Sequence, residues 1–419
     1  MDLRRLEKTL HEMNQFGRSK EGVTRLAYSK EERQAAEHFS SLCRKEGMDV
    51  RIDTCGNVIA RREGSNPDLP VVACGSHLDT VIHGGNYDGV LGVVAALEVI
   101  RSLNEKGVTT EHPIEIIAFA CEESSRFGVS TIGSKAMAGI LEKESLSEIS
   151  DSKGNLINDV FSECSLNFNE IEKSIRQKEE FKVFLEMHIE QGPVLERQLK
   201  QIGIVTGIAA PTRFEVKIKG QASHSGTTPM DYRRDAFLSA AEIALQLEQA
   251  AKMEAGNGTV ATVGACEVKP GSMNVIPDLA TMKIDIRGTS IDSKNRVTER
   301  LFAVVKQVEQ KRNVSIEYSK LSDEHPINLD REVIESLSQS CEQKGYTYTH
   351  IASGAGHDAM NMAMLCPTGL LFVPSKNGLS HHPGEYTKME QIGIGADLLE
   401  MAIIEWAGYS QGVNRSKIL

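Results

Sequence analysis

The run Leu69-Pro-Val-Val-Ala-Cys-Gly-Ser76 is apolar along most of its length and is as short as a single strand buried on both faces. Apolar residues then recur at helical spacing from Gly89 to Leu103, and Pro113–Ala120 forms another apolar run of strand length. A strand, a helix and a strand in this order, with both strands apolar, indicate a parallel sheet between layers of helices. We therefore expect an α/β domain here.

The segments on both sides of this region carry further patterns. Met48–Ile52 and Val58–Arg61 have the alternation and turn signals of a strand pair. Arg331–Lys344 predicts a helix, and Thr368–Val373 predicts another buried strand. The stretch Glu142–Glu180 is polar and charged with few apolar residues, so it predicts solvated helices and loops.

The pattern changes between residues 213 and 321, where apolar residues alternate, as in Phe214, Val216 and Ile218. Strand and helix patterns then follow in the order β-α-β-β-α-β, which is the signature of a ferredoxin-like sandwich. We therefore predict a discontinuous α/β catalytic domain of residues 1–211 and 325–419, in which helices flank a mixed sheet. Residues 212–324 would form an inserted ferredoxin-like α+β domain.

Size and composition agree with a globular protein of two domains. The 419 residues exceed the roughly 250–300 at which a single hydrophobic core stops growing. Hydrophobic residues make up 40% and charged residues 25% of the chain, which excludes a collagen-like or disordered protein. The formal net charge of -11 argues against nucleic acid as a partner, since phosphate binding needs concentrated Lys and Arg.

Three features concern the compartment. The N-terminus, Met1–Glu7, is charged and amphipathic and lacks the apolar stretch of a secretory signal. No apolar run reaches the roughly 18 residues that span a membrane, so we expect no membrane partner. The eight cysteines are scattered, and Cys74, Cys121 and Cys366 lie in apolar runs. A reducing, cytoplasmic location fits this usage best.

Residues of the types that commonly bind metals follow several of the predicted strands, at the edge where α/β sheets place their sites. They are His77, Asp79, Asp88, Glu122, Glu123, His188, His381 and His382. Each has an ordinary alternative, namely a structural histidine, a solvated glutamate pair or a simple glycine loop. These alternatives do not explain why all of them flank predicted buried strands, so we favour a metal site.

Local spacing suggests how these residues cooperate. In His77-x-Asp79 both side chains project to one side of an extended chain, so Asp79 can accept the free ring N–H of a metal-bound His77. Asp88 lies among glycines that let the backbone turn toward an ion, and its carboxylate can bridge two metals. Glu122 and Glu123 face opposite ways, so one can hold metal while the other stays free as a base.

Longer motifs around these residues carry a family resemblance. They are Gly75-Ser-His-Leu-Asp-Thr80, Gly84-Gly-Asn-Tyr-Asp-Gly89, Cys121-Glu-Glu-Ser-Ser-Arg-Phe127, Glu186-Met-His-Ile-Glu-Gln-Gly192, Gln221-Ala-Ser-His-Ser225, Met273-Asn-Val-Ile-Pro277 and Ser380-His-His-Pro-Gly-Glu-Tyr386. Over nearly its whole length the chain resembles the amidase/hydantoinase/carbamoylase branch of the M20 metallopeptidase-like family. That branch includes N-carbamoyl-L-amino acid hydrolases, β-ureidopropionases and allantoate amidohydrolases.

The resemblance implies a two-metal hydrolase. His77 and His188 would ligate one divalent ion, Glu123 and His381 the other, and Asp88 would bridge both. His382 competes with His381, because relatives often carry Asn or Ser at this second position. Zinc is the default metal, and manganese and cobalt suit the same ligands. Glu122 would act as general base, taking a proton from an activated water and returning it to the departing nitrogen.

The resemblance also assigns residues to the substrate and to a second subunit. His224 would stabilise the developing negative charge, and Asn274 and Arg287 would hold a carboxylate. Gln191, Gly356 and His357 would contact the ureido group. The inserted domain would serve as a lid and form a homodimer in which His224 and Asn274 reach the partner's site.

We therefore expect a small ureido carboxylate as substrate. The leading expectation is hydrolysis of the carbamoyl C–N bond of N-carbamoyl-L-amino acids, giving the amino acid, carbon dioxide and ammonia. Allantoate amidohydrolase is the nearest alternative, and a dipeptidase or aminoacylase of the same family is more distant. A binding protein that has lost catalysis is disfavoured, because every expected ligand and Glu122 are present.

Overall fold

The chain divides into two units in the computed structural model, which describes residues 1–408. Unit 1 comprises Met1–Thr206, Leu329–Ile351 and the residues from His357 onward. Unit 2 comprises Gly207–Asn328 and Ala352–Gly356. The chain thus leaves unit 1 and later returns to it. The main boundaries between the units lie after residues 206 and 328, where we expected them after residues 211 and 324.

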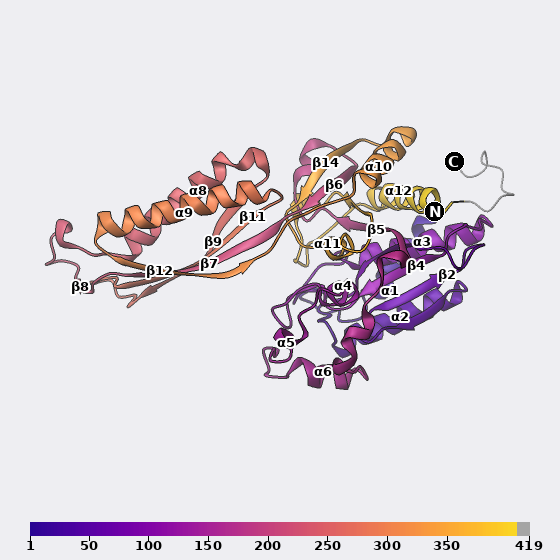
Figure 1. The fold of residues 1–419 in the computed structure, drawn as a ribbon, viewed down its shortest axis with the longest axis horizontal. Coiled ribbons are helices and arrows are strands. Elements are labelled where there is room, and N and C mark those ends of the chain that lie inside the picture. Colours follow the sequence, from indigo (N-terminus) through magenta and orange to yellow (C-terminus); the bar gives the residue numbers. More distant parts are fainter. Residues whose placement is uncertain (409–419) are drawn as a thin grey trace. The chain divides into compact units, whose positions relative to one another are not determined.

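Unit 1 is built on a sheet with the strand order β1-β2-β4-β3-β5-β15-β6 (Figure 1). These strands are β1 (Asp49–Ile52), β2 (Val58–Arg62), β4 (Ile114–Phe119), β3 (Val71–His77), β5 (Phe181–Ile189), β15 (Thr368–Val373) and β6 (Ile202–Ile208). β3 is parallel to β4 and β5, and β15 is parallel to β5. The pairs β1–β2, β2–β4 and β15–β6 are antiparallel, so the sheet is mixed, as predicted.

Helices bury the central strands of this sheet. The long ones are α1 (Leu3–Met13), α2 (Lys30–Lys45), α3 (Val90–Glu105), α10 (Arg331–Lys344) and α12 (Met389–Ala407). Every residue of β3 and β4 is buried, and α3 is buried from Val90 to Leu103. α3 contacts β3 and β5 as well as α1 and α12. Because it is enclosed in this way, its sequence is apolar nearly all round rather than amphipathic.

The stretch between β4 and β5 contains the mostly exposed helices and loops that were expected for residues 142–180, together with a small buried core. It forms the short helices α4 (Ile132–Met137), α5 (Lys143–Leu146) and α6 (Ile157–Glu163). Its few apolar residues, such as Phe161 and Phe168, pack with Tyr28 and Phe127 in a small second core. One or two apolar residues suffice to anchor a short helix, so the polar average composition concealed this core.

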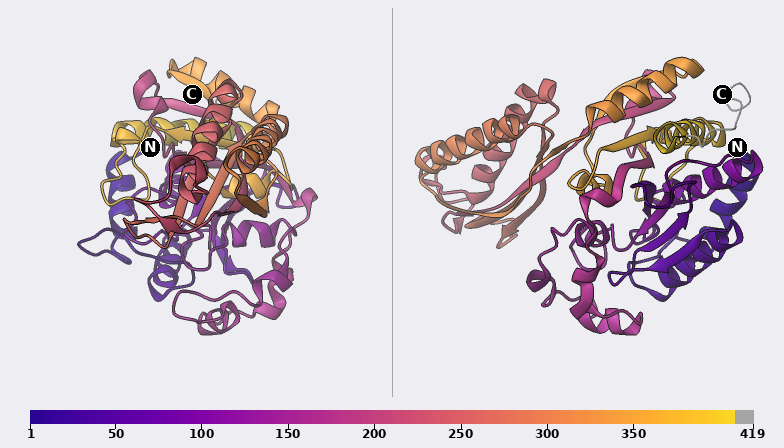
Figure 2. Two further views of the ribbon diagram at one scale, coloured as in Figure 1. Left: turned by 90° about the vertical axis from the view of Figure 1, so that its left-hand side faces the viewer. Right: turned by 45° about the vertical axis from the view of Figure 1, so that its right-hand side comes forward.

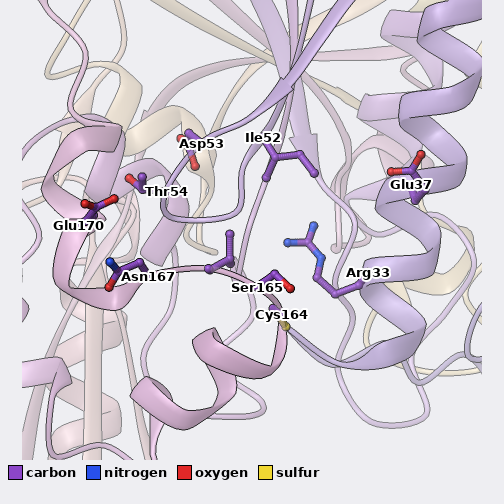
Figure 3. A pocket seen from close by; sticks show the side chains of 10 residues that line it. Arg33, Glu37, Ile52, Asp53, Thr54, Cys164, Ser165, Asn167 and Glu170 are labelled. Carbon is purple, nitrogen blue, oxygen red and sulfur yellow. The ribbon is translucent and has the colours of Figure 1, made fainter.

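A cavity of about 500 Å³ adjoins this second core (Figure 3). Its lining includes Arg33 from α2 and Asp53 after β1. Arg33 lies 3.3 Å from Glu32, and the Asp53 carboxylate accepts three main-chain N–H groups and the side-chain amide of Asn57. These two charges are therefore used by the fold itself.

Unit 2 is a four-stranded antiparallel sheet in the order β12-β7-β11-β9, with α8 and α9 on one face (Figures 1 and 2). Its elements are β7 (Ala210–Lys219), α8 (Ala236–Met253), β9 (Val260–Lys269), β11 (Leu279–Gly288), α9 (Ile291–Arg312) and β12 (Ser315–Asp323). Phe214, Val216 and Ile218 pack into its core, as their alternation predicts. The elements follow one another in the β-α-β-β-α-β order that was expected for a ferredoxin-like sandwich. A small ribbon of β8 (Ser223–His224) and β10 (Val275–Ile276) completes the unit.

Two further expectations can be compared with the described residues. None of their helices combines the length and the apolar character that a membrane crossing needs. All eight cysteines are free, and Cys74, Cys121 and Cys366 are buried, as their apolar surroundings indicate.

Candidate metal centre and active site

Two groups of candidate metal ligands lie in unit 1. The first group is His77, Asp88 and His188, and the second is Asp88, Glu123 and His381. Within each group, one ligand atom of each residue lies within 4.8 Å of the others. Asp88 belongs to both groups, so a single carboxylate connects them.

The parallel strands bring these residues to one edge of the sheet. His77 ends β3 and lies opposite Phe119 of β4, so Glu122 and Glu123 emerge just beyond that strand. β3 also pairs with β5 in a register that, when continued, brings His188 level with His77. The two imidazole centroids are 6.0 Å apart. This edge carries the carboxyl ends of the strands, as expected for a site of this fold class.

Asp88 lies immediately before α3, where the backbone approaches His77 closely. Gly89 has a φ of +66°, and a Cβ atom there would lie 2.3 Å from the His77 ring, so this turn requires glycine. The Asp88 carboxylate lies 3.5 Å from His77 Nε2, 3.3 Å from His188 Nε2 and 3.4 Å from His381 Nε2. Burial raises the pKa of Asp88, but these histidines outweigh it and hold the pKa well below its usual range.

The histidines present the correct nitrogen to a metal. His77 Nδ1 lies 3.0 Å from the main-chain oxygen of Asp79, and His188 Nδ1 lies 2.9 Å from that of Ile189. A carbonyl oxygen only accepts, so each Nδ1 donates and the Nε2 of the neutral ring carries the lone pair. In His188 this Nε2 accepts the main-chain N–H of Gly89 at 3.1 Å.

The electrostatics of the cluster also fit cations. Burial opposes protonation of His77 and His188, yet the surrounding carboxylates raise the pKa of both above the ordinary value. Hydrogen bonds with Asp88 and Glu123 raise the pKa of His381 to about 10. Carboxylates that draw protons onto three histidines create a demand for positive charge. Divalent ions meet that demand when the histidines are deprotonated, so the donor set fits divalent metal ions.

Asp79 supports the site in a different way from the one expected. Its carboxylate oxygen lies 3.6 Å from His77 Nδ1, beyond hydrogen-bond distance, and its main-chain oxygen accepts from the ring instead. The carboxylate accepts the main-chain N–H groups of Glu122 at 3.1 Å and Glu123 at 2.9 Å. Asp79 therefore fixes the turn that carries both glutamates.

Glu122 and Glu123 have different surroundings. Glu123 Oε1 lies 3.1 Å from His381 Nε2. Glu122 Oε2 lies 3.8 Å from His77 Nε2, and Glu122 belongs to neither ligand group. Burial, together with the negative charges of Glu123, Asp358 and Asp79, raises the pKa of Glu122 well above its usual range. Glu122 is thus a buried carboxyl group that lies beside the ligands without joining them.

The geometry favours His381 over His382 as the ligand. His382 is exposed, its Nδ1 accepts the main-chain N–H of Gly384 at 2.9 Å, and it belongs to neither group. Three residues at the site have left-handed backbone: Cys121, Gln191 and His381, with φ of 53°, 57° and 55°. Such strain in residues other than glycine is typical of functional sites.

Two of the residues expected at the ureido group lie against the ligands. Gln191 Nε2 donates to Asp88 at 2.7 Å, and the buried Gln191 Oε1 has no hydrogen-bond partner among the described residues. His357 is buried with its ring 4.6 Å from that of His188, and burial holds its pKa well below the usual value. Gly356 precedes His357 in the chain and belongs to unit 2.

The other expected substrate residues lie in unit 2. His224 is exposed on β8 opposite Val275, and its Nδ1 accepts the N–H of Gly226 at 3.0 Å, which leaves Nε2 as the N–H donor of the neutral ring. Asn274 is exposed beside β10. Arg287 projects from β11 on the face opposite the core and contacts Asp285 at 3.0 Å.

Sequence reasoning missed three supporting residues. Ser380 donates to Asp88 at 2.7 Å, and the buried Glu385 accepts the main-chain N–H groups of Tyr87 and Asp88. Glu186 is fully buried and accepts from Ser76 at 2.8 Å. All three lie within the motifs quoted above, and that position was the available signal.

Comparison with known proteins places the chain in a family. The model of peptidase family M20/M25/M40 matches residues 73–405, so the chain belongs to this family. The chain is 44% identical to an uncharacterized hydrolase of Haemophilus influenzae, over 97% of this chain and 99% of that protein. It is 39% identical to an N-carbamoyl-L-amino acid amidohydrolase of Geobacillus stearothermophilus, over 94% of this chain and 96% of that protein.

Other similar proteins carry related names. The chain is 35% identical to the allantoate amidohydrolase of Escherichia coli, over 96% of this chain and 97% of that protein. It is also 35% identical to a rice ureidoglycolate hydrolase, over 95% of this chain and 83% of that protein. The crystal structure of an amidase of the hydantoinase/carbamoylase family from Burkholderia multivorans matches with a TM-score of 0.90 and 33% identity, covering 97% and 98% of the two chains. The chain is therefore an amidohydrolase that acts on C–N bonds of linear amides.

Proposed function

We propose that this enzyme hydrolyses the ureido C–N bond of N-carbamoyl-L-amino acids with two divalent metal ions. The observation that carries the proposal is the pair of ligand groups that share Asp88, with the buried carboxyl group of Glu122 beside them. A relative named for this activity, at 39% identity, supports the choice of substrate class.

The metal ligands follow from the two groups. His77 and His188 would hold one ion, Glu123 and His381 the other, and Asp88 both. Nitrogen and oxygen donors of this kind suit zinc by default, and also manganese or cobalt. When bound, two such ions bring the pKa of a water molecule toward neutrality.

Glu122 is the proposed general base. It would take a proton from the attacking water as the water oxygen bonds to the carbamoyl carbon, and return it to the amino nitrogen as the C–N bond breaks. The products are the free amino acid and carbamate, which decomposes to carbon dioxide and ammonia. The burial that raises the pKa of Glu122 suits a group that must accept and release a proton.

The remaining polar residues would orient the substrate. Gln191 and His357 lie beside Asp88 and His188, where a ureido group would contact them, with Gly356 next to His357. The neutral tautomer of His224 offers an N–H group to the developing oxyanion. Arg287, with Asn274, would bind the substrate carboxylate, which must compete with Asp285 for the guanidinium.

Distances within unit 2 support a homodimer. His224 and Asn274 lie at the β8–β10 ribbon, near the start of β11, whereas Arg287 lies toward the end of that strand. The eight residue steps from Leu279 to Arg287 span about 26 Å. One small substrate cannot contact both ends of this strand, so we propose that His224 and Asn274 complete the site of a second copy.

The surface of unit 2 offers an interface for that second copy. β9 is an edge strand of the sheet, and α8 packs beside it. Leu238, Leu245 and Met253 are 40%, 63% and 68% exposed along one face of α8. An open strand edge next to an exposed apolar stripe is typical of a surface that is covered by a partner.

Allantoate and ureidoglycolate are the alternative substrates, since proteins named for both match at 35% identity. Each presents a ureido group close to a carboxylate, so the residues above would serve them equally. A dipeptidase or aminoacylase activity is more distant. The cytoplasmic location remains a prediction that the eight free cysteines support.

The test is ammonia release by metal-loaded enzyme offered N-carbamoyl-L-amino acids, N-carbamoyl-β-alanine, allantoate, ureidoglycolate and dipeptides. A chelator-treated sample is the control. We expect chelator-sensitive turnover with the highest kcat/KM for N-carbamoyl-L-amino acids. A preference for allantoate or ureidoglycolate would transfer the proposal to that substrate, and inactivity on every ureido compound would refute it.

A further inference from the structure

Three of the candidate ligands do not come from strands: Glu123 lies just beyond β4, and the other two lie in two further loops of unit 1. Asp88 lies in the loop before α3, and His381 lies in the segment between β15 and α12. His77 and His188, in contrast, lie on β3 and β5 inside the sheet. The first ligand group therefore draws one residue from these loops, whereas the second group draws two.

Glu385 connects the two loops. Its side chain is buried, and its Oε1 accepts the main-chain N–H groups of Tyr87 at 2.8 Å and Asp88 at 3.1 Å. Its Oε2 lies 3.2 Å from the hydroxyl of Ser380, which also lies 2.7 Å from the Asp88 carboxylate. One carboxylate thus contacts the backbone of one loop and the residue before the ligand of the other, His381.

The Asp88 loop is shaped to receive this carboxylate. A Cβ atom at Gly85 would lie 2.3 Å from the Glu385 carboxyl group, so the loop and the side chain fit only when residue 85 is glycine. The main-chain N–H of Glu385 donates to the main-chain oxygen of His382 at 3.0 Å, which closes the turn that directly follows His381. These contacts set the separation between Asp88 and His381.

We propose that Glu385 is a positioning residue that aligns the second ligand group, Asp88, Glu123 and His381, and so controls the affinity of one metal ion more than that of the other. This inference rests on the two-metal centre proposed above. Outer partners of metal ligands affect metal affinity by about 10–100-fold. We expect that loss for the second ion in Glu385→Ala and a smaller loss for the first.

The experiment is calorimetric titration of chelator-treated enzyme with Mn²⁺, with the exchange-coupled electron paramagnetic resonance signal of two adjacent Mn²⁺ ions as an independent readout. Glu385→Ala should bind the first ion nearly normally, bind the second about 10–100-fold more weakly, and lose the coupled signal. Glu385→Gln keeps an oxygen for the two N–H groups and should restore both. Gly85→Ala should reproduce the loss, because it displaces the Glu385 side chain.

Glu400→Ala is the matched control, since Glu400 is also buried but bonds to Ser102 and Lys106. It should bind two ions with wild-type affinity, and an equal loss there would overturn the specific role of Glu385. Normal binding of both ions by Glu385→Ala would overturn the inference while leaving the metal centre intact. Failure of the wild-type enzyme to bind two ions would remove the proposed metal centre and this inference together.

Discussion

Replacement of Glu122 by glutamine separates catalysis from folding and metal binding. The side chain is buried, belongs to neither ligand group and approaches His77 only to 3.8 Å. Glutamine has nearly the same shape but cannot accept a proton from water. We therefore expect the variant to bind two ions and to lose turnover.

The expected loss of rate follows from the proton transfer alone. General acid–base groups contribute about 10²–10⁴-fold, which corresponds to about 3–5 kcal/mol of transition-state stabilisation. The expected change in stability has the opposite sign. Burial raises the pKa of Glu122 above its ordinary value of 4.5, so the carboxyl group ionises less readily in the folded, metal-free enzyme than in the unfolded chain. The folded enzyme therefore loses stability as the pH rises. Glutamine removes that cost.

Both effects can be measured on the same protein. Turnover of N-carbamoyl-L-amino acids by the metal-loaded variant gives the first, and thermal unfolding in chelator from about pH 5 to 8 gives the second. The melting temperature of Glu122→Gln should equal or exceed that of wild type, with an advantage that grows with pH. Glu123→Gln is the neighbouring control and should lose one ion. Wild-type turnover by a Glu122→Gln enzyme with two ions would refute the assignment of the base.

Asp88→Ala should lose both ions, whereas Glu123→Ala should lose one, which the metal content after gel filtration would reveal. Because the pKa of His381 is raised to about 10 without metal, an ion must displace a proton at neutral pH. Apparent affinity should therefore rise by up to about tenfold per pH unit for each proton displaced, as measured by calorimetry from about pH 7 to 9. Gly89→Ala should weaken metal binding at least about tenfold while the protein still folds, because the added Cβ meets a ligand ring. Leu245→Asp should yield monomers in sedimentation velocity that retain two ions but lose turnover, and an active monomer would exclude the shared site.

The sequence predicted the order of elements well where apolar runs were long. The strand at Val71–His77 and the helix at Val90–Glu105 are buried so completely that their composition alone identifies them. The ferredoxin-like order of elements was predictable for a related reason. Apolar and polar residues alternate along β7, and the apolar ones lie on the face that packs against the helices. For Glu142–Glu180 the solvated helices and loops were predictable, but the small core was not, since it depends on a few residues that contact distant parts of the chain.

The grouping of the candidate ligands was predictable from the sequence, but the residues that support them were not. Neighbouring parallel strands must present their ends at one edge, so the amino-acid pattern alone suffices to group His77, Glu123 and His188. Which atom of Asp79 meets the imidazole depends on a local turn that spacing does not encode. The link between Asp88 and Glu385 joins residues 297 positions apart, and no local pattern reports such a contact.

The left-handed backbone at Cys121, Gln191 and His381 has a consequence for laboratory evolution of this enzyme. Each such residue costs the folded chain about 1–2 kcal/mol relative to an unstrained position. A screen for heat resistance alone would therefore favour glycine or asparagine at these positions. It would select proteins that are more stable but whose active site is impaired. Libraries aimed at a robust biocatalyst should keep these three codons fixed and seek their gains elsewhere.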